Sequence, residues 1–182
     1  MKPMDNAMRI EGETVSLRPI TAKDTEVVLS WRNSPEVVNN FIYRKHISVQ
    51  EHMDWLENKV FAGEVHQFII CAKTDGVPLG SIYLQNFDEE NNKAEEGIFL
   101  GANTAYGKGI GTQAAKLMLN YAFSVLGLHK VSARVLAYNK ASIRMHEKVG
   151  YTQEAYFKEE LFLDGRYEDL IFFGAINSRK EG

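Results

Sequence analysis

A glycine-rich turn, Tyr106-Gly107-Lys108-Gly109-Ile110-Gly111-Thr112, has the clearest chemical potential in the chain. It follows an apolar run that predicts a strand, and it precedes an amphipathic segment that predicts a long helix. Glycines tolerate positive φ and let a ligand approach the backbone, while the first amides of a helix are unpaired and carry partial positive charge. The segment predicts a cradle for a phosphate or pyrophosphate. A tight turn that binds nothing is the alternative.

The glycine spacing differs from two common nucleotide-binding motifs. The Rossmann fingerprint requires G-x-G-x-x-G after the first strand of its unit, whereas the spacing here is G-x-G-x-G after the fourth predicted strand. A Walker A loop, G-x-x-x-x-G-K-[ST], is absent. These differences disfavour a generic nucleotide-binding α/β protein.

A second segment, residues 138–151, also leaves a predicted strand and enters a short helix. Asn139 is suited to cap that helix, a role compatible with ligand binding. His146 lies within the helix, and a lone histidine there can be a packed or exposed imidazole without a catalytic role.

The elements that must position these residues can be read from periodicity and turn signals. Strands are expected at residues 14–20, 66–72, 79–87, 93–100, 131–137, 151–163 and 168–176. Helices are expected at residues 21–32, 36–42, 48–60, 112–126 and 142–149, the second of them a short turn. Two of the helices have apolar stripes: Val49, Met53, Leu56 and Val60 in one, and Ala114, Leu117, Met118, Tyr121, Ala122 and Val125 in the other. The order β-α-α-β-β-β-α-β-α-β-β predicts one α/β domain with a mixed sheet.

Composition excludes several function classes. The chain has 21 Lys and Arg against 24 Asp and Glu, so no basic excess indicates a nucleic-acid partner. Its single cysteine, Cys71, cannot form an internal disulfide and lies in an apolar run typical of a buried strand. No Cys/His cluster predicts a metal site. No segment resembles a signal peptide or a membrane span, so a cytoplasmic location is expected.

With both segments in view, the sequence resembles the GNAT superfamily of acetyltransferases. The family motif Q/R-x-x-G-x-G/A corresponds to residues 106–111, and its later N-x-x-S/A…G-F/Y signature corresponds to Asn139, Ser142, Gly150 and Tyr151. The element order also matches from about residue 13 to residue 176. The resemblance, strongest to the ribosomal-protein N-terminal and spermidine acetyltransferase branch, implies a GNAT domain at residues 13–177. Residues 1–12 are then an N-terminal extension and residues 178–182 a tail.

The resemblance implies an acetyl-CoA-dependent N-acetyltransferase that needs no metal. Its acetyl-CoA site would contain backbone groups of the fourth strand and both motifs: Ile98, Phe99, Leu100, Tyr106, Gly107, Lys108, Gly109, Ile110, Gly111, Thr112, Asn139 and Ser142. The sequence departs from the family pattern at Tyr106, where Gln or Arg is usual, and at His146, where many relatives have a Tyr that protonates the leaving thiolate. A catalytically degenerate GNAT domain that binds acyl-CoA as a sensor or interaction module is therefore the alternative.

The resemblance also makes Glu95 the candidate base for the attacking amine, and His146 the candidate acid. Glu95 and Glu96 should point to opposite faces of their strand, so at most one of them is expected to face the cleft.

The acceptor is expected to be a small-molecule or peptide amine: a protein N-terminus, a polyamine or an amino-sugar nucleotide. Candidate acceptor-binding residues are Trp31, Arg32, Glu159 and Tyr167. Trp31 either stacks on the substrate or belongs to the core, and Arg32 either binds a substrate phosphate or carboxylate or lies on the surface. No membrane partner is expected, and a homodimer is possible by family habit.

Overall fold

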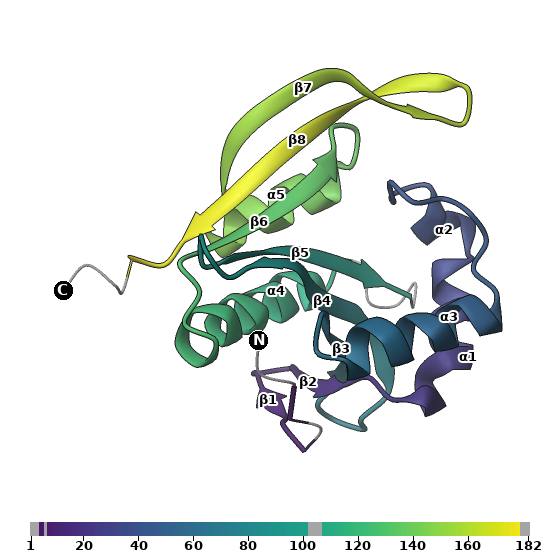
Figure 1. Ribbon diagram of the computed structural model, residues 1–182, viewed down its shortest axis with the longest axis vertical. Helices are drawn as coiled ribbons and strands as arrows, with labels where there is room; N and C mark the ends of the chain where they lie inside the picture. Colours follow the sequence, from purple (N-terminus) through teal and green to yellow (C-terminus); the bar gives the residue numbers. More distant parts are fainter. Residues whose placement is uncertain (1–3, 6, 102–106, 179–182) are drawn as a thin grey trace.

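An eight-stranded mixed sheet forms the framework of the computed structural model, which describes residues 4, 5, 7–101 and 107–178 (Figure 1). The strand order is β1-β2-β3-β4-β5-β6-β8-β7, and every neighbouring pair is antiparallel except β5 and β6. The strands are β1 (Ile10–Glu11), β2 (Val15–Pro19), β3 (His66–Ala72), β4 (Pro78–Asp88), β5 (Lys93–Leu100), β6 (Lys130–Leu136), β7 (Thr152–Leu163) and β8 (Arg166–Ile176). The expected order is confirmed, with β1 added from the segment predicted as an extension.

In the described part of the chain, five α-helices cover the two faces of this sheet: α1 (Thr25–Arg32), α2 (Pro35–Val38), α3 (Val49–Trp55), α4 (Ile110–Asn120) and α5 (Lys140–Val149). Alternation along the strands produces two separate cores. Ile69 of β3 and Phe99 of β5 belong to a cluster with residues of α1 and α2. Phe68 and Ile70 belong to the other cluster, which contains the buried face of α4. Helices α1 to α3 therefore occupy one face, and α4 and α5 the other.

Side-chain caps begin the first helical segments, as the sequence predicts. Ser48 and Glu51 form a reciprocal capping box at the start of α3. Thr21 and Asp24 form another around the 3-10 turn Ala22–Asp24 that leads into α1. Asp24 also accepts two hydrogen bonds from Arg18, the shorter at 2.6 Å, so the same carboxylate connects β2 to the start of α1.

The two predicted apolar stripes are partly wrong. In α3 and the π turn that follows it, the buried positions are His52, Leu56 and Val60, so the stripe passes through His52, and Met53 is exposed. In the later helix Met118 is buried, whereas Val125 is 60% exposed. Both helices continue into π turns, Leu56–Phe61 and Tyr121–Val125. Their wider repeat changes the helical phase, which removes Val125 from the stripe.

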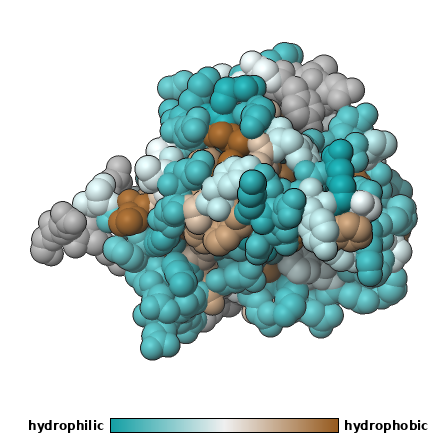
Figure 2. Space-filling view, turned by 90° about the horizontal axis from the view of Figure 1, so that it is seen from above, coloured by the Kyte–Doolittle hydropathy of each residue, from teal (hydrophilic) through white to brown (hydrophobic). Residues whose placement is uncertain are grey.

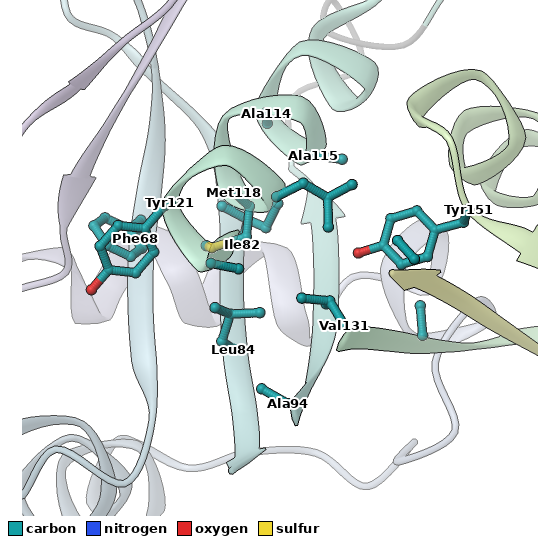
Figure 3. Packing of buried hydrophobic residues seen from close by; sticks show 14 of the residues in the cluster. Phe68, Ile82, Leu84, Ala94, Ala114, Ala115, Met118, Tyr121, Val131 and Tyr151 are labelled. Atoms are coloured by element: carbon teal, nitrogen blue, oxygen red, sulfur yellow. The ribbon is translucent and has the colours of Figure 1, made fainter. Parts of the chain in front are cut away.

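The larger core lies between α4 and the middle of the sheet (Figure 3). Ala114, Ala115 and Met118 of α4 face Ile82 and Leu84 of β4 in this cluster.

The outer surface seen in Figure 2 is mostly hydrophilic, with small separate apolar patches. Among the described residues no helix combines the length and apolar character needed to cross a membrane.

Removing the Met118 side chain should destabilise the fold, because its buried contacts with β4 would be replaced by a cavity. We expect Met118→Ala to lower the free energy of unfolding by about 2–5 kcal/mol in denaturant titrations. Val125→Ala is the matched control from the same predicted stripe and should change it by less than about 0.5 kcal/mol. Equal losses in the two variants would contradict the altered helical phase.

Candidate active site

The parallel strands β5 and β6 pair over only half of β5. Lys93–Glu96 pairs with Lys130–Ala133, after which the two strands separate (Figure 1). The other edge of β5 stays paired with β4 as far as Leu100. Residues Gly97–Phe99 therefore have no β6 partner on one edge, where their backbone groups can pair with a ligand.

The glycine turn begins α4 next to this gap. Gly107 and Gly109 have φ of 77° and 75°, in the left-handed region, and Gly109 is the N-cap residue of α4. A Cβ atom at either glycine would have no described heavy atom within 4 Å, so both positions face open space. Together with the first amides of α4, they can cradle an anion. Tyr106 lies outside the described residues.

Asn139 begins α5 on the other side of the gap. Its Oδ1 atom accepts a hydrogen bond of 3.1 Å from the amide of Ser142, which confirms the expected cap. The helices α4 and α5 approach closely, because a Cβ atom at Gly111 would lie 3.1 Å from the Sδ atom of Met145. Two helix N-termini are thus held beside the free edge of β5.

Glu96 is a fully enclosed carboxyl group on the face of β5 that carries α4 and α5. It is 3% exposed, and the hydroxyl of Tyr151 donates a 2.8 Å hydrogen bond to its Oε2 atom. Burial raises the pKa of Glu96 to about 8, against the opposing effect of the Tyr151 bond. At neutral pH the carboxyl group is therefore mostly protonated.

His146 lies against Glu96 from α5. Its Nδ1 atom is 2.8 Å from the carbonyl oxygen of Ser142, and because a carbonyl only accepts, Nδ1 carries a proton in this contact. Burial lowers the pKa of His146, which favours the neutral ring. Its Nε2 atom is then an acceptor, 3.8 Å from Oε1 of Glu96. The two buried side chains are therefore neighbours, although the distance between these atoms exceeds that of a hydrogen bond.

Glu95 points to the opposite face of β5, toward α1 to α3. Its Oε1 atom accepts hydrogen bonds from Nε and Nη2 of Arg134, at 3.1 and 2.9 Å. Longer contacts come from Gln85 and Asn86 of β4. This carboxylate is oriented by a cation and by two amides, in contrast to the enclosed Glu96.

A single cavity of about 810 Å³ connects these parts. Both Glu95 and Glu96 are among the residues that line it, but the side chain of Glu96 is completely buried, so Glu95 is the one of the two whose side chain is accessible, in agreement with the expectation that at most one faces the cleft. The alternation was predicted correctly, and the cavity extends through the gap between β5 and β6 and reaches both faces. Most of the expected site residues also line the cavity: Arg32, Ile98, Phe99, Leu100, Gly107, Gly109, Ile110, Gly111, Thr112, Asn139, Ser142 and His146.

Trp31 and Lys108 are not among the residues that line this cavity. Trp31 is a core residue: it is buried, and its ring lies edge-on to Phe99. A Cβ atom at Gly101 would lie 2.0 Å from the Trp31 ring, so the indole occupies the space that this glycine leaves. Lys108 is exposed in the turn before α4.

The expected acceptor residues Glu159 and Tyr167 also lie outside the cavity. Both are exposed on the β7–β8 hairpin, which extends beyond the rest of the sheet (Figure 1). The Tyr167 ring packs against Phe162, and the amide of Glu159 donates to Asp169 within the same hairpin. Their contacts support the hairpin itself.

The tip of this hairpin contacts the segment between α2 and α3. Arg44 pairs with Asp164 at the hairpin turn and donates a hydrogen bond to the hydroxyl of Tyr138. Tyr138 directly precedes the cap residue of α5 and donates to the carbonyl of Asn39.

Among the described residues, no group of three or more His, Cys, Asp or Glu side chains is arranged to hold a metal ion.

Comparison with known proteins identifies the family. Residues 14–152 match the model of the acetyltransferase (GNAT) domain. Spermidine N(1)-acetyltransferase of Escherichia coli K12 is 27% identical over 160 residues, which cover 88% of this chain and 84% of that protein.

Two solved structures share the fold. The crystal structure of spermidine N-acetyltransferase from Vibrio cholerae in complex with CoA and spermine has a TM-score of 0.84 at 22% identity, covering 91% of this chain and 96% of that one. Ribosomal-protein-S5-alanine acetyltransferase from Vibrio fischeri has a TM-score of 0.82 at 20% identity, covering 96% and 100%. The family match extends over most of the sheet and both motifs, and the chain belongs to the GNAT family of acetyltransferases.

Proposed function

We propose that this acetyltransferase binds acetyl-CoA from the α4–α5 side of the sheet and transfers its acetyl group to a primary amine that enters from the α1–α3 side. The observation that carries the proposal is the cavity through the β5–β6 gap, with Glu95 on one face of β5 and the Glu96–His146 pair on the other. Each face has a group suited to one of the two proton transfers that the reaction needs.

The described residues fit acetyl-CoA well. The amides at the start of α4, next to Gly109, can bind its pyrophosphate. The free edge of β5 at Gly97–Phe99 can pair with the amides of its pantetheine arm. Acetyl-CoA supplies the activated acetyl group as a thioester. The relative from Vibrio cholerae was solved with CoA, which supports this choice of donor.

Glu95 is the proposed base on the acceptor face. A protonated amine has no lone pair for attack, and an alkyl amine of the Lys type is mostly protonated at neutral pH because its pKa is about 10.4. Glu95 can accept that proton directly or through a water molecule. Arg134 holds the carboxylate in position with its two hydrogen bonds.

Glu96 and His146 together are the proposed acid on the donor face. Glu96 holds a proton at neutral pH, and the Nε2 atom of His146 lies 3.8 Å from its Oε1 atom. The pair gives this proton to the sulfur atom that leaves as the C–S bond breaks. Solvent then returns a proton to the pair, and the proton removed from the amine passes from Glu95 to solvent.

Membership of the family does not determine the class of acceptor. Relatives are named for spermidine and for ribosomal protein, so a small-molecule amine and a peptide amine are both compatible with the family. A degenerate domain that binds acyl-CoA without turnover remains the competing function. The presence of an oriented carboxylate and a proton-holding pair in one cavity favours the enzyme.

Substitution of Gly109 by glutamate should abolish tight acetyl-CoA binding, because it introduces a bulky anion where the pyrophosphate is expected. We expect Gly109→Glu to weaken affinity at least about 100-fold in calorimetric titrations. Gly76→Glu is the matched control, since Gly76 has φ of 74° and equally open surroundings in the β3–β4 turn. Similar affinity in both variants would contradict the proposed pyrophosphate site.

Substitution of Glu95 by glutamine should lower turnover without changing acetyl-CoA affinity. We expect Glu95→Gln to reduce kcat/KM for the amine about 100-fold at neutral pH. The defect should shrink as the pH approaches the pKa of the amine, because the amine then needs no base. Glu90→Gln, at an exposed turn position, is the control. A defect that is constant with pH would indicate that Glu95 has another role.

Substitution of Glu96 by glutamine should change both stability and rate. The unfolded chain releases the Glu96 proton near the usual pKa of 4.5, whereas the folded chain retains it until about 8. The free energy of unfolding should therefore decrease as pH rises between these values, by at most about 1.4 kcal/mol per pH unit. Glu96→Gln should remove this slope in denaturant titrations at several pH values, while the exposed Glu147→Gln should retain it.

The same Glu96→Gln variant should lower kcat about 100-fold, because the amide has no acidic proton to donate. In the wild-type enzyme kcat should fall above about pH 8, where Glu96 ionises. An altered stability profile with normal kcat would assign Glu96 a purely structural role.

A further inference from the structure

Arg32 ends α1 in the wall of the cavity, on the acceptor face. Its guanidinium carbon lies 4.0 Å from the centroid of the Phe41 ring and 5.7 Å from that of Phe99. Nη2 makes one contact at the limit of hydrogen bonding, 3.5 Å to the carbonyl oxygen of Tyr43. Nη1 is buried and has no hydrogen-bond partner among the described residues. The two aromatic rings contact the guanidinium group, but the N–H donors of Nη1 have no acceptor among the described residues.

No carboxylate of the described chain forms an ion pair with Arg32. By contrast, each of four other arginines forms an ion pair with an acidic side chain: Arg18, Arg44, Arg134 and Arg166. The titratable groups that act on Arg32 are the phenols of Tyr83 and Tyr43. Burial lowers the pKa of Arg32, but a guanidinium stays charged at neutral pH. A partly desolvated cation without an anion is costly, and a bound anionic group would remove that cost.

His52 gives a second, independent indication on the same α1–α3 side of the cavity. It is 5% exposed on α3, lines the cavity, and neither ring nitrogen has a hydrogen-bond partner among the described residues. Burial lowers the pKa of His52, so the ring is neutral at pH 7 and offers one donor and one acceptor. Buried polar groups in proteins are normally paired. Two unpaired ones, from α1 and α3, indicate a binding site for a polar group.

Tyr83 connects this region to the proposed base. Its side chain crosses β5 at Gly97, where a Cβ atom would lie 2.2 Å from the ring. Arg32 and Glu95 both act electrostatically on the Tyr83 hydroxyl, as Arg134 and Glu96 do, so the unpaired cation and the base both lie near one phenol. An acceptor that spans Tyr83 can place its amine at Glu95 and a second group at Arg32.

The acidic groups of this end of the cavity do not neutralise Arg32. Glu36 and Glu51 line the cavity but are exposed at its rim, and Glu51 is engaged in the cap of α3. Glu95 is paired with Arg134. A free polyamine would bring its second ammonium group toward Arg32, where like charges repel.

On the basis of the proposed function, we infer that the acceptor amine carries a carboxylate or phosphate group. Arg32 binds this anion, His52 adds a hydrogen bond, and the amine lies next to Glu95. Arg32 and His52 are thus specificity-determining residues, and the cavity selects against free polyamines. The acceptor is an amino acid, a peptide with a nearby carboxylate, or an aminoalkyl phosphate or nucleotide, all of which share this chemistry.

The test uses matched acceptor pairs that differ only in the anion. Alanine is compared with alaninamide, and 2-aminoethyl phosphate with 2-aminoethanol, with spermidine as the polycation. Thiol release from acetyl-CoA measures turnover, and calorimetry in the presence of CoA measures binding of each amine. We expect at least one anionic member to exceed its neutral counterpart at least 10-fold in kcat/KM or affinity. The pair that shows the preference distinguishes carboxylate from phosphate.

Substitution of Arg32 should remove this preference. Arg32→Met keeps an apolar stem against Phe41 and should weaken use of the anionic amine about 10- to 100-fold more than use of its neutral counterpart, mainly through KM. Arg32→Lys should restore part of the loss. Lys45→Met removes the same charge from an exposed position outside the cavity and is the control.

Three results would overturn the inference: a preference for spermidine, equal use of anionic and neutral amines, or an anion preference that survives in Arg32→Met. Binding of none of the anionic amines would also count against it. Failure of acetyl-CoA to bind would instead refute the proposed function. The effect of Arg32→Met on amine binding, measured by calorimetry, would still test the inference. Retained acetyl-CoA affinity in Arg32→Met would show that the acceptor site and the acetyl-CoA site are separate.

Discussion

Backbone pairing between β5 and β6 stops after Glu96 and Ala133, and the candidate site depends on this interruption. A continuous sheet would separate the two layers of helices completely. The gap provides a free strand edge, places the N-termini of α4 and α5 beside it, and lets one cavity reach both faces. Since buried backbone groups need partners, the free edge is itself a recognition element for a ligand with amide groups.

The same interruption gives two adjacent carboxyl groups different chemistry. Glu96 points into the enclosed layer below α5, where burial outweighs its bond from Tyr151 and keeps it protonated near neutral pH. Glu95 points to the other layer and is held by Arg134. Two acidic residues whose environments differ in this way can act as acid and base in one reaction.

Much of this framework could be predicted from local sequence. The limits of β3 and β5, both capping boxes and the left-handed glycines before α4 follow from periodicity and turn chemistry. The exposure of Val125 could not be predicted, because it depends on the π turn Tyr121–Val125, which the helical repeat of the sequence does not indicate. The place of Glu96 in the candidate site could not be predicted from the local sequence either. Alternation correctly places it opposite Glu95, but its enclosure by Tyr151 and His146 is a long-range property of the fold. Glu159 and Tyr167 belong to a hairpin whose direction no local pattern determines.

The two hydrophobic cores on opposite faces of the sheet share few residues, and each supports one half of the site. Substitutions in the core beneath α1 to α3 can reshape the region proposed here for the acceptor while the packing behind α4 and α5 stays intact. The fold therefore lets natural selection, or directed evolution in the laboratory, exchange one acceptor for another without rebuilding the donor half.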